Sequence, residues 1–218
     1  MFRWSFARRR DAAAERIDPQ SAYELWAASY EPSPHNRLME LEQATAFALM
    51  PDVRGLTALD VGCGSGRYLQ ELDSRGAVAF GLDLSMPMLK RARRQSARVA
   101  RADLRVLPFN AMTIDLAICG LALGDVAELE LALGEIARVL RPGGRAIYSV
   151  VHPAGENAGW SRTFESGGRQ WAIDGHWHSL VRHRQACAAA GLSIEEWREP
   201  VLPERPDQPA VLVVRARR

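Results

Sequence analysis

One stretch decides the fold of this chain: Leu59-Asp60-Val61-Gly62-Cys63-Gly64-Ser65-Gly66-Arg67. It follows the short apolar run Leu56-Thr57-Ala58 and leads into residues 68–72, where apolar side chains recur at helical spacing. We therefore predict a strand, a tight glycine loop and a helix, in that order. Glycines at alternate positions allow positive φ angles and let a ligand approach bare main chain. Because the following helix points unpaired N–H groups at the same place, the loop is predicted to bind a nucleotide-like molecule.

Two residues of this stretch narrow the class of ligand. A dinucleotide fingerprint, Gly-x-Gly-x-x-Gly, needs its third glycine at position 67, which is Arg67 here. Asp60 ends the predicted strand and puts a negative charge beside the loop, where it favours a cationic group and repels a pyrophosphate. An adenosine that carries an amino acid has this mixture of charges. An NAD-linked oxidoreductase stays open as an alternative, with Arg67 against it.

An apolar strand that ends in Asp-x-Gly-x-Gly-x-Gly resembles the first motif of the class I S-adenosylmethionine-dependent methyltransferases. The chain looks like their type 11 small-molecule group, which includes ubiquinone and menaquinone methyltransferases and the malonyl-carrier-protein O-methyltransferase. The resemblance implies S-adenosylmethionine as the cofactor and S-adenosylhomocysteine as the product. It also implies an α/β fold: a Rossmann-like, mostly parallel sheet of seven strands, with the last strand antiparallel, helices on both faces and an N-terminal helical lid.

The composition is that of an ordinary soluble protein. The chain has 218 residues, of which 47% are apolar and 25% charged, and a net charge of +2. No field of one sign is implied across the surface, so nucleic acid is not an expected partner. No apolar run approaches the roughly 20 residues of a membrane span. Three scattered cysteines favour a cytoplasmic location, and the sequence implies no particular oligomeric state.

We divide the chain into a basic flexible tail, residues 1–16, and a single methyltransferase domain, residues 17–218. Within the domain we expect a helical lid (17–51), a cofactor-binding half (55–151), and a substrate-side loop with closing strands (152–218). Two prolines, at positions 32 and 34, break the lid into two helices.

The ribose of the cofactor is assigned to Asp83. This acid ends the second predicted strand, 77–83, where nucleoside-binding α/β folds use an acid to accept both sugar hydroxyls. A residue that only caps the next helix is the alternative, but Ser85 already fills that role. By resemblance, Leu84 and Met88 pad the adenosine, although Met88 also fits a core position.

The adenine is assigned to Asp103 and Leu104, which follow a short strand at 97–100. In the family an acid here accepts from the adenine amino group, with the neighbouring backbone beside the ring. An aspartate that only forms a turn is the alternative.

The methionine end is assigned partly to the lid. The pattern Tyr-x-x-Trp-Ala-x-x-Tyr at 23–30 looks like the lid of small-molecule methyltransferases. The resemblance places Tyr30 near the methionine end and Arg37 at its carboxylate; aromatic packing and a solvated arginine are the alternatives. Gly62, Gly64 and Cys119 complete the predicted cofactor contacts.

Three residues are predicted to line the acceptor site: Asp125, His152 and His178. Related enzymes often carry histidine where this chain has Asp125, so the residue is either a substrate contact or an acid that leads a helix. His152 follows the strand 146–151, at the ligand-facing edge of a parallel sheet. His178 alternates with His176 as if on one side of a strand. No third ligand accompanies these histidines, so no metal is expected.

The other elements follow from periodicity. We predict a strand at 114–119 and a helix at 128–140, and then an inserted loop or small hairpin at 154–175. A helix at 180–190 and closing strands at 192–199 and 210–215 complete the fold.

The predicted function is methyl transfer to a small-molecule acceptor, free or carrier-bound, by in-line displacement. The sulfur leaves as a neutral group and needs no acid, and a carboxylate or free amine acceptor needs little help from a base. A cofactor-binding partner or sensor without turnover stays open, since Asp125 replaces a histidine. An RNA methyltransferase is disfavoured, because Cys119-Gly120-Leu121-Ala122 stands where base-modifying members carry Asn/Asp-Pro-Pro-aromatic.

Overall fold

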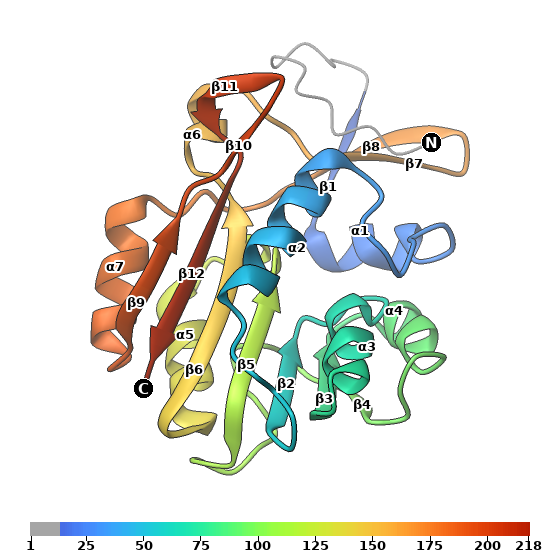
Figure 1. Ribbon diagram of the computed structural model, residues 1–218. Helices are drawn as coiled ribbons and strands as arrows, with labels where there is room; N and C mark the ends of the chain where they lie inside the picture. Colours follow the sequence, from blue (N-terminus) through green and yellow to red (C-terminus); the bar gives the residue numbers. More distant parts are fainter. Residues whose placement is uncertain (1–13) are drawn as a thin grey trace.

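The chain is built on a twisted sheet of seven strands (Figure 1). The computed structural model describes residues 14–218. From one edge to the other the strands are β4 (Val99–Arg101), β3 (Val78–Asp83), β2 (Thr57–Val61), β5 (Ile114–Gly120), β6 (Leu140–Val151), β12 (Val211–Arg217) and β9 (Ser193–Arg198). Strands β4 to β6 pair in parallel, whereas β12 is antiparallel to both of its neighbours. The predicted fold class is confirmed.

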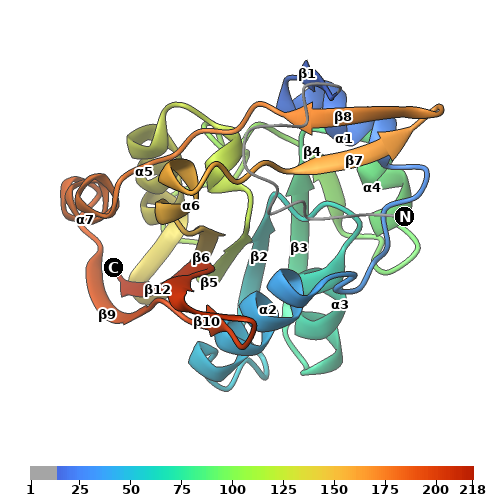
Figure 2. The same cartoon turned by 90° about the horizontal axis from the view of Figure 1, so that it is seen from above.

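Helices cover both faces of the sheet (Figures 1 and 2). On one face lie α2 (Arg37–Leu49) and α3 (Arg67–Ser74), and on the other α5 (Leu129–Val139) and α7 (Leu180–Ala189). After Asp115, strand β5 is apolar because it is buried on both sides: Leu116 and Ile118 join one core cluster, and Ala117 and Cys119 join the other. A shorter helix, α4 (Met86–Ala92), packs on β3 and β4. Within residues 14–218, no helix is long and apolar enough to cross a membrane.

A small second sheet lies beyond the carboxyl ends of the parallel strands (Figure 2). Its strands, in spatial order, are β1 (Glu15–Ile17), β8 (Arg169–Ile173) and β7 (Thr163–Ser166). In the chain, β7 and β8 follow the short helix α6 (Ala154–Asn157). The predicted insertion at 154–175 therefore contains a hairpin. It packs on α1 (Pro19–Trp26), where the rings of Trp26 and Phe164 stack with centroids 5.2 Å apart.

The predicted lid divides into two parts with different surroundings. Helix α1 joins the hairpin above the sheet, whereas α2 packs on β6 and β12. The predicted tail is too long, because Glu15 and Arg16 already belong to β1, whose partner β8 is distant in sequence. Residues 1–13 lie outside the described part of the chain.

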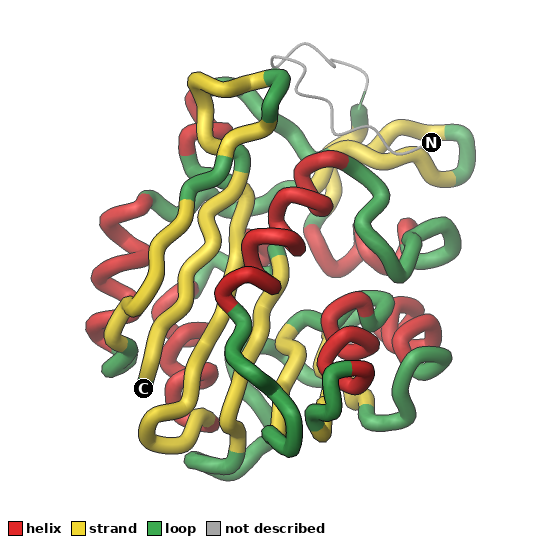
Figure 3. The backbone as a smooth tube through the Cα atoms, in the orientation of Figure 1, coloured by secondary structure: helices red, strands yellow, loops and turns green. Residues whose placement is uncertain are grey.

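The strand predicted around 176–178 is wrong: residues 174–179 run as a loop (Figure 3). The His176 N–H donates to the Gly124 carbonyl at 2.7 Å instead of joining a ladder.

Strand β6 begins at Leu140 rather than 146, with a register shift opposite Ile114 and Leu116. An unpredicted hairpin, β10 (Val201–Leu202) and β11 (Arg205–Pro209), joins β9 to β12, and a 3-10 turn, η1 (Leu123–Asp125), follows β5.

Glu42 links α2 to α3 and β6 by hydrogen bonds. Its carboxylate is fully buried and accepts from the Tyr68 hydroxyl and the Ser149 hydroxyl, each at 2.6 Å, and from the Arg67 guanidinium at 3.0 Å. Replacing Glu42 with alanine is expected to lower the free energy of unfolding by about 3 kcal/mol, because the arginine would be left buried without its partner. Urea denaturation measures the change. The matched variant Glu40→Ala, on an exposed position of the same helix, should shift stability by less than about 0.5 kcal/mol.

Candidate active site

A cavity of about 380 Å³ lies where the strand order reverses, between β2 and β5. Its walls come from the glycine loop, the ends of β3 and β5, residues 102–105 and helix α1. In an open parallel sheet such a switch point at the carboxyl ends of the strands is the usual ligand site. The cavity therefore lies where the sequence predicted ligand binding.

The glycine loop brings bare main chain to this cavity. Gly62, Gly64 and Gly66 all have positive φ angles, as predicted from their spacing. A Cβ atom on Gly62 would lie 2.6 Å from the Cβ of Ala122, so a side chain there would collide with the segment after β5. A Cβ on Gly64 would meet no atom within 4 Å, which leaves open space for a ligand against its backbone.

Asp60 lies beneath the loop with 1% of its surface exposed. Its carboxyl accepts from the Leu69 N–H at 3.1 Å, in the first turn of α3. Burial raises the pKa of Asp60 to about 7, although the nearby Arg67 opposes the shift. A cationic group beside this carboxyl would stabilise its ionised form.

Asp83 ties the loop to the end of β3. One carboxylate oxygen accepts from the Gly64 N–H and the other from the Ser85 N–H, both at 2.8 Å. Burial raises the pKa of Asp83, and these two N–H groups counteract the shift. Each oxygen keeps a lone pair for a further donor. Ser85 caps α4 by accepting from the Met88 N–H, so Asp83 is not needed as a cap.

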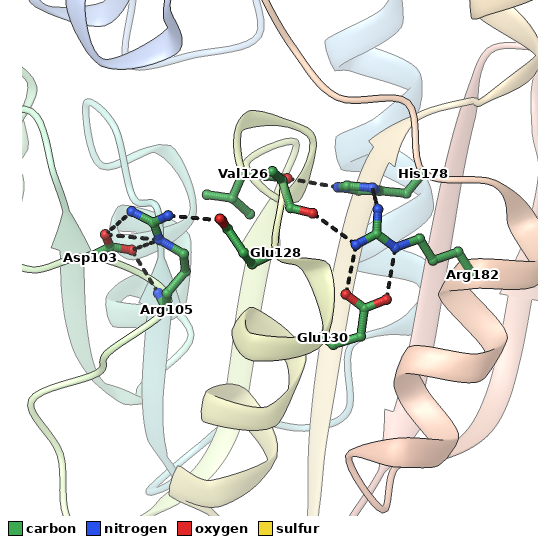
Figure 4. Close-up of polar contacts among 8 residues, drawn as sticks. Asp103, Arg105, Val126, Glu128, Glu130, His178 and Arg182 are labelled. Carbon is green, nitrogen blue, oxygen red and sulfur yellow. Dashed lines mark hydrogen bonds and ion pairs between the residues drawn. The ribbon is translucent and has the colours of Figure 1, made fainter.

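Asp103 is held by an arginine (Figure 4). The guanidinium of Arg105 donates to both of its oxygens, at 3.0 and 2.6 Å, and also to Glu128 at 2.9 Å. Side-chain hydrogen bonds from Arg105 hold the pKa of Asp103 below its usual range. The three residues line the cavity, so its wall presents an ionised carboxylate, that of Asp103, whose position is fixed.

An ion pair between Arg162 and Asp125 also lines the cavity. Their side chains are 14% and 12% exposed, and the pair joins the loop before β7 to η1. The guanidinium also donates to the Tyr23 hydroxyl at 3.5 Å. Burial, reinforced by the charge of Asp125, raises the pKa of Tyr23 well above its usual value, and burial raises that of Tyr30 to about 12. Both phenols therefore stay protonated at neutral pH, so each can donate a hydrogen bond to a ligand.

Residues 59–148 match a family model described as a methyltransferase domain. In its sequence the chain is similar to malonyl-[acyl-carrier protein] O-methyltransferases, with 38% identity to that of Salmonella typhimurium over 55% of this chain and 49% of the relative. The corresponding enzyme of Pectobacterium atrosepticum is 37% identical over 54% of this chain and 48% of the relative. A solved S-adenosylmethionine-dependent methyltransferase from Mesorhizobium loti superposes with a TM-score of 0.68 and 29% identity, covering 81% of this chain and 97% of that one.

Residues 59–148 of the chain therefore form a methyltransferase domain that resembles those of the class I S-adenosylmethionine-dependent methyltransferases. The family resemblance seen in the sequence is confirmed, and S-adenosylmethionine is the cofactor of this family. The chain spans about half the length of the curated relatives it matches.

The structure gathers nine of the predicted site residues on the cavity. They are Tyr30, Asp60, Gly62, Gly64, Asp83, Leu84, Asp103, Leu104 and Asp125. Three other predicted cofactor contacts do not line it: Arg37 is exposed at the start of α2, and Met88 and Cys119 are buried in the core.

The two predicted acceptor-site histidines also lie off this cavity, and both ring nitrogens of each are engaged. His152 pairs through Nε2 with Glu199 at 2.9 Å, and its Nδ1 accepts from the Ala154 N–H at 3.1 Å. In His178, Nδ1 accepts from Arg182 at 3.1 Å, so Nε2 carries the proton and donates to the Val126 carbonyl at 2.8 Å (Figure 4). These contacts fix the segment after η1 and leave neither ring poised as a base.

Residues that sequence reasoning missed complete the cavity wall, above all Tyr23, Arg67, Arg105 and Arg162. In the sequence, Arg67 was used only as evidence against a dinucleotide fingerprint, because it occupies the position of the third glycine. In the structure its guanidinium donates to Gln43 and Glu42 on α2. Arg162 lies in the insertion at 154–175, whose sequence shows no clear periodicity. The only feature that could have indicated a functional role for Arg162 was its positive charge in such a loop. Among residues 14–218, no group of three or more histidine, cysteine, aspartate or glutamate side chains could hold a metal ion.

The pKa of Asp60 predicts a pH dependence for ligand binding. At pH 6 this carboxyl is largely protonated in the ligand-free protein. An ammonium group beside it favours the carboxylate, so binding of S-adenosylhomocysteine should release a proton. We expect its affinity to rise from about pH 5.5 to about pH 7 and then to level off. Calorimetry in two buffers with different ionisation enthalpies measures the released proton, and Asp60→Asn should remove the dependence.

The same group affects the stability of the ligand-free protein in the opposite direction. Its folded pKa lies above the usual aspartate value of 3.8. Its contribution to stability is therefore complete below that value and is lost as the pH rises through about 7.

Proposed function

We propose that this protein transfers the methyl group of S-adenosylmethionine to a carboxylate oxygen of a small acyl acceptor, free or attached to a carrier protein. The cytoplasm is the proposed site of this reaction. The observation that carries the proposal is one cavity lined both by the acids Asp60, Asp83 and Asp103 and by the Arg162–Asp125 pair. The relatives named as malonyl-[acyl-carrier protein] O-methyltransferases support a carboxylate acceptor on a carrier.

The residues at the donor end fit the cofactor. We assign the ribose hydroxyls to Asp83, whose oxygens have spare lone pairs, and the adenine amino group to Asp103. The bare backbone of Gly64 and the raised pKa of Asp60 suit the amino-acid half, which carries an ammonium group. When bound, the cofactor supplies an electrophilic methyl group on a sulfonium.

At the acceptor end, Arg162 and Tyr23 supply the donors for a carboxylate. The arginine already contacts the tyrosine hydroxyl, and both groups face the same cavity. Asp125 holds the guanidinium in place and offsets its charge until an acceptor arrives. In this arrangement the protein needs no base, because a carboxylate is ionised before it binds. Its main contribution is to align the acceptor oxygen with the methyl group in a site shielded from water.

A methyl-transfer assay tests this function. The purified protein is incubated with malonyl-carrier protein and S-adenosylmethionine that carries a deuterated methyl group, and the carrier is examined by mass spectrometry. The proposal expects one labelled methyl ester per malonyl group and none on acetyl-carrier protein, which lacks the free carboxylate. Labelled acetyl-carrier protein, or no label on any acyl carrier or free carboxylic acid, would contradict it.

A further inference from the structure

A second cavity, of about 360 Å³, adjoins the first. The two cavities share the side chains of Leu121, Val151, Arg162 and His176. The ion pair that we assign to the acceptor carboxylate therefore lies at the junction. Beyond it, the second cavity is enclosed by the end of β6, residues 159–163, the loop 175–178 and helix α7.

His183 lines the second cavity and has an unusual environment. It is completely buried on α7, and within residues 14–218 neither of its ring nitrogens has a hydrogen-bond partner. The ring is held by Tyr148, stacked at a centroid distance of 5.7 Å, and by His178, edge-on at 6.0 Å. A buried polar group normally has a partner, so a fixed imidazole that borders a cavity and lacks one points to a missing ligand.

The protonation state of His183 restricts that ligand. Burial lowers its pKa to about 4, and the nearby His178 and Arg182 contribute in the same direction. The neutral ring has one nitrogen that donates and one that accepts. It therefore matches an uncharged group that can donate or accept a hydrogen bond, such as a hydroxyl or a secondary amide.

The rest of the wall is suited to an uncharged, partly apolar body. Two tryptophans, Trp160 and Trp177, face the cavity together with valine and isoleucine side chains. The charged side chains on its wall are Arg162 at the junction and the exposed Arg16 and Glu156, and Arg16 is paired with Asp174. Apart from the junction, charge is therefore confined to exposed positions.

We propose that the second cavity is the acceptor channel, in which the body of an acyl acceptor lies with its carboxylate at Arg162 and an amide or hydroxyl group hydrogen-bonded to His183. The proposal rests on the function proposed above and specifies its substrate class: a carboxylic acid joined to an uncharged arm that carries such a group. Donor and acceptor then occupy separate cavities that meet at the ion pair.

The first test reads His183 directly. Protein labelled with ¹⁵N-histidine and saturated with S-adenosylhomocysteine is titrated with the malonyl thioester of N-acetylcysteamine, which combines a carboxylate with an amide-bearing arm. The His183→Phe variant assigns the signal. We expect the His183 ring nitrogens to shift with the malonyl thioester and not with malonate, which lacks the arm. If His183 is only hydrated, its signals will not respond, although the thioester binds, and the proposal is overturned.

The second test blocks the channel. Ser161 lines the second cavity only, so Ser161→Phe should fill it and raise the KM for the malonyl thioester at least about tenfold. The matched variant Ser166→Phe lies in the same insertion, at the end of β7, on neither cavity wall and should leave KM unchanged. His183→Phe should raise KM about tenfold through the lost hydrogen bond. All three variants should bind S-adenosylhomocysteine as the wild type does.

The outcomes separate the two proposals. If the wild type methylates the thioester but Ser161→Phe and His183→Phe do so with unchanged KM, the channel is wrong and the proposed function stands. If the wild type binds S-adenosylhomocysteine but neither binds nor methylates the thioester, the proposed acceptor class is wrong, and the channel inference is overturned with it.

Discussion

Replacing Asp83 with alanine is expected to weaken the binding of S-adenosylhomocysteine about a thousandfold. The carboxylate is the proposed acceptor for both ribose hydroxyls, and a hydrogen bond to a charged group contributes roughly 1.5–3 kcal/mol. The change would also release the Gly64 N–H, which Asp83 holds at 2.8 Å, so the loop would lose its fixed position. Calorimetric titration of the wild type and the variant measures the difference.

Asp115→Ala is the matched control for this experiment. Asp115 also accepts a backbone N–H, that of Thr57 at 2.8 Å, but it is the second residue of β5 and does not line the cavity. It should therefore lower stability without changing the dissociation constant by more than about threefold. Equal losses of affinity in the two variants would show that Asp83 acts only through the fold.

Replacing Arg162 with glutamine is expected to lower kcat/KM for malonyl-carrier protein about a thousandfold, while the affinity for S-adenosylhomocysteine changes less than about threefold. The guanidinium is the proposed charged donor to the acceptor carboxylate, and its hydrogen bonds are among the strongest that a protein makes. The variant would also leave Asp125 without its partner in the cavity wall, where the two side chains are 14% and 12% exposed.

The double variant Arg162→Gln with Asp125→Asn separates these two effects. It removes both charges, so the free energy of unfolding should recover most of the loss seen with Arg162→Gln alone. Activity should not recover, because the donor to the carboxylate is still absent. Recovery of kcat/KM in the double variant would mean that Arg162 serves the fold and not the acceptor.

The glycine loop shows why much of the donor end could be predicted from sequence. Its chemistry depends on local features: the positive φ angles of Gly62 and Gly64, and an acid at the end of each of two strands. Such features recur at fixed positions in the chain, so a single sequence displays them. The seven-stranded, mostly parallel sheet was implied by the family resemblance that this loop carries, and the structure confirms it.

The acceptor end could not be predicted because its partners are distant in sequence. Arg162 meets Asp125 and Tyr23 only after the insertion folds over α1, and nothing near Arg162 in the chain indicates these contacts. The histidine assignments illustrate the same limit. His152 stands at a strand end as expected, but Glu199, far along the chain, engages its ring. His183 carries no such local signal, because its lack of hydrogen-bond partners among residues 14–218 becomes apparent only in the folded protein.

A crystal structure of the protein with S-adenosylhomocysteine tests the central claim most directly. We expect the ribose hydroxyls to donate to the Asp83 carboxylate and the adenine amino group to donate to Asp103. We expect the sulfur to be directed toward the junction at Arg162. A nucleoside bound elsewhere, or one whose ribose makes no contact with Asp83, would contradict it.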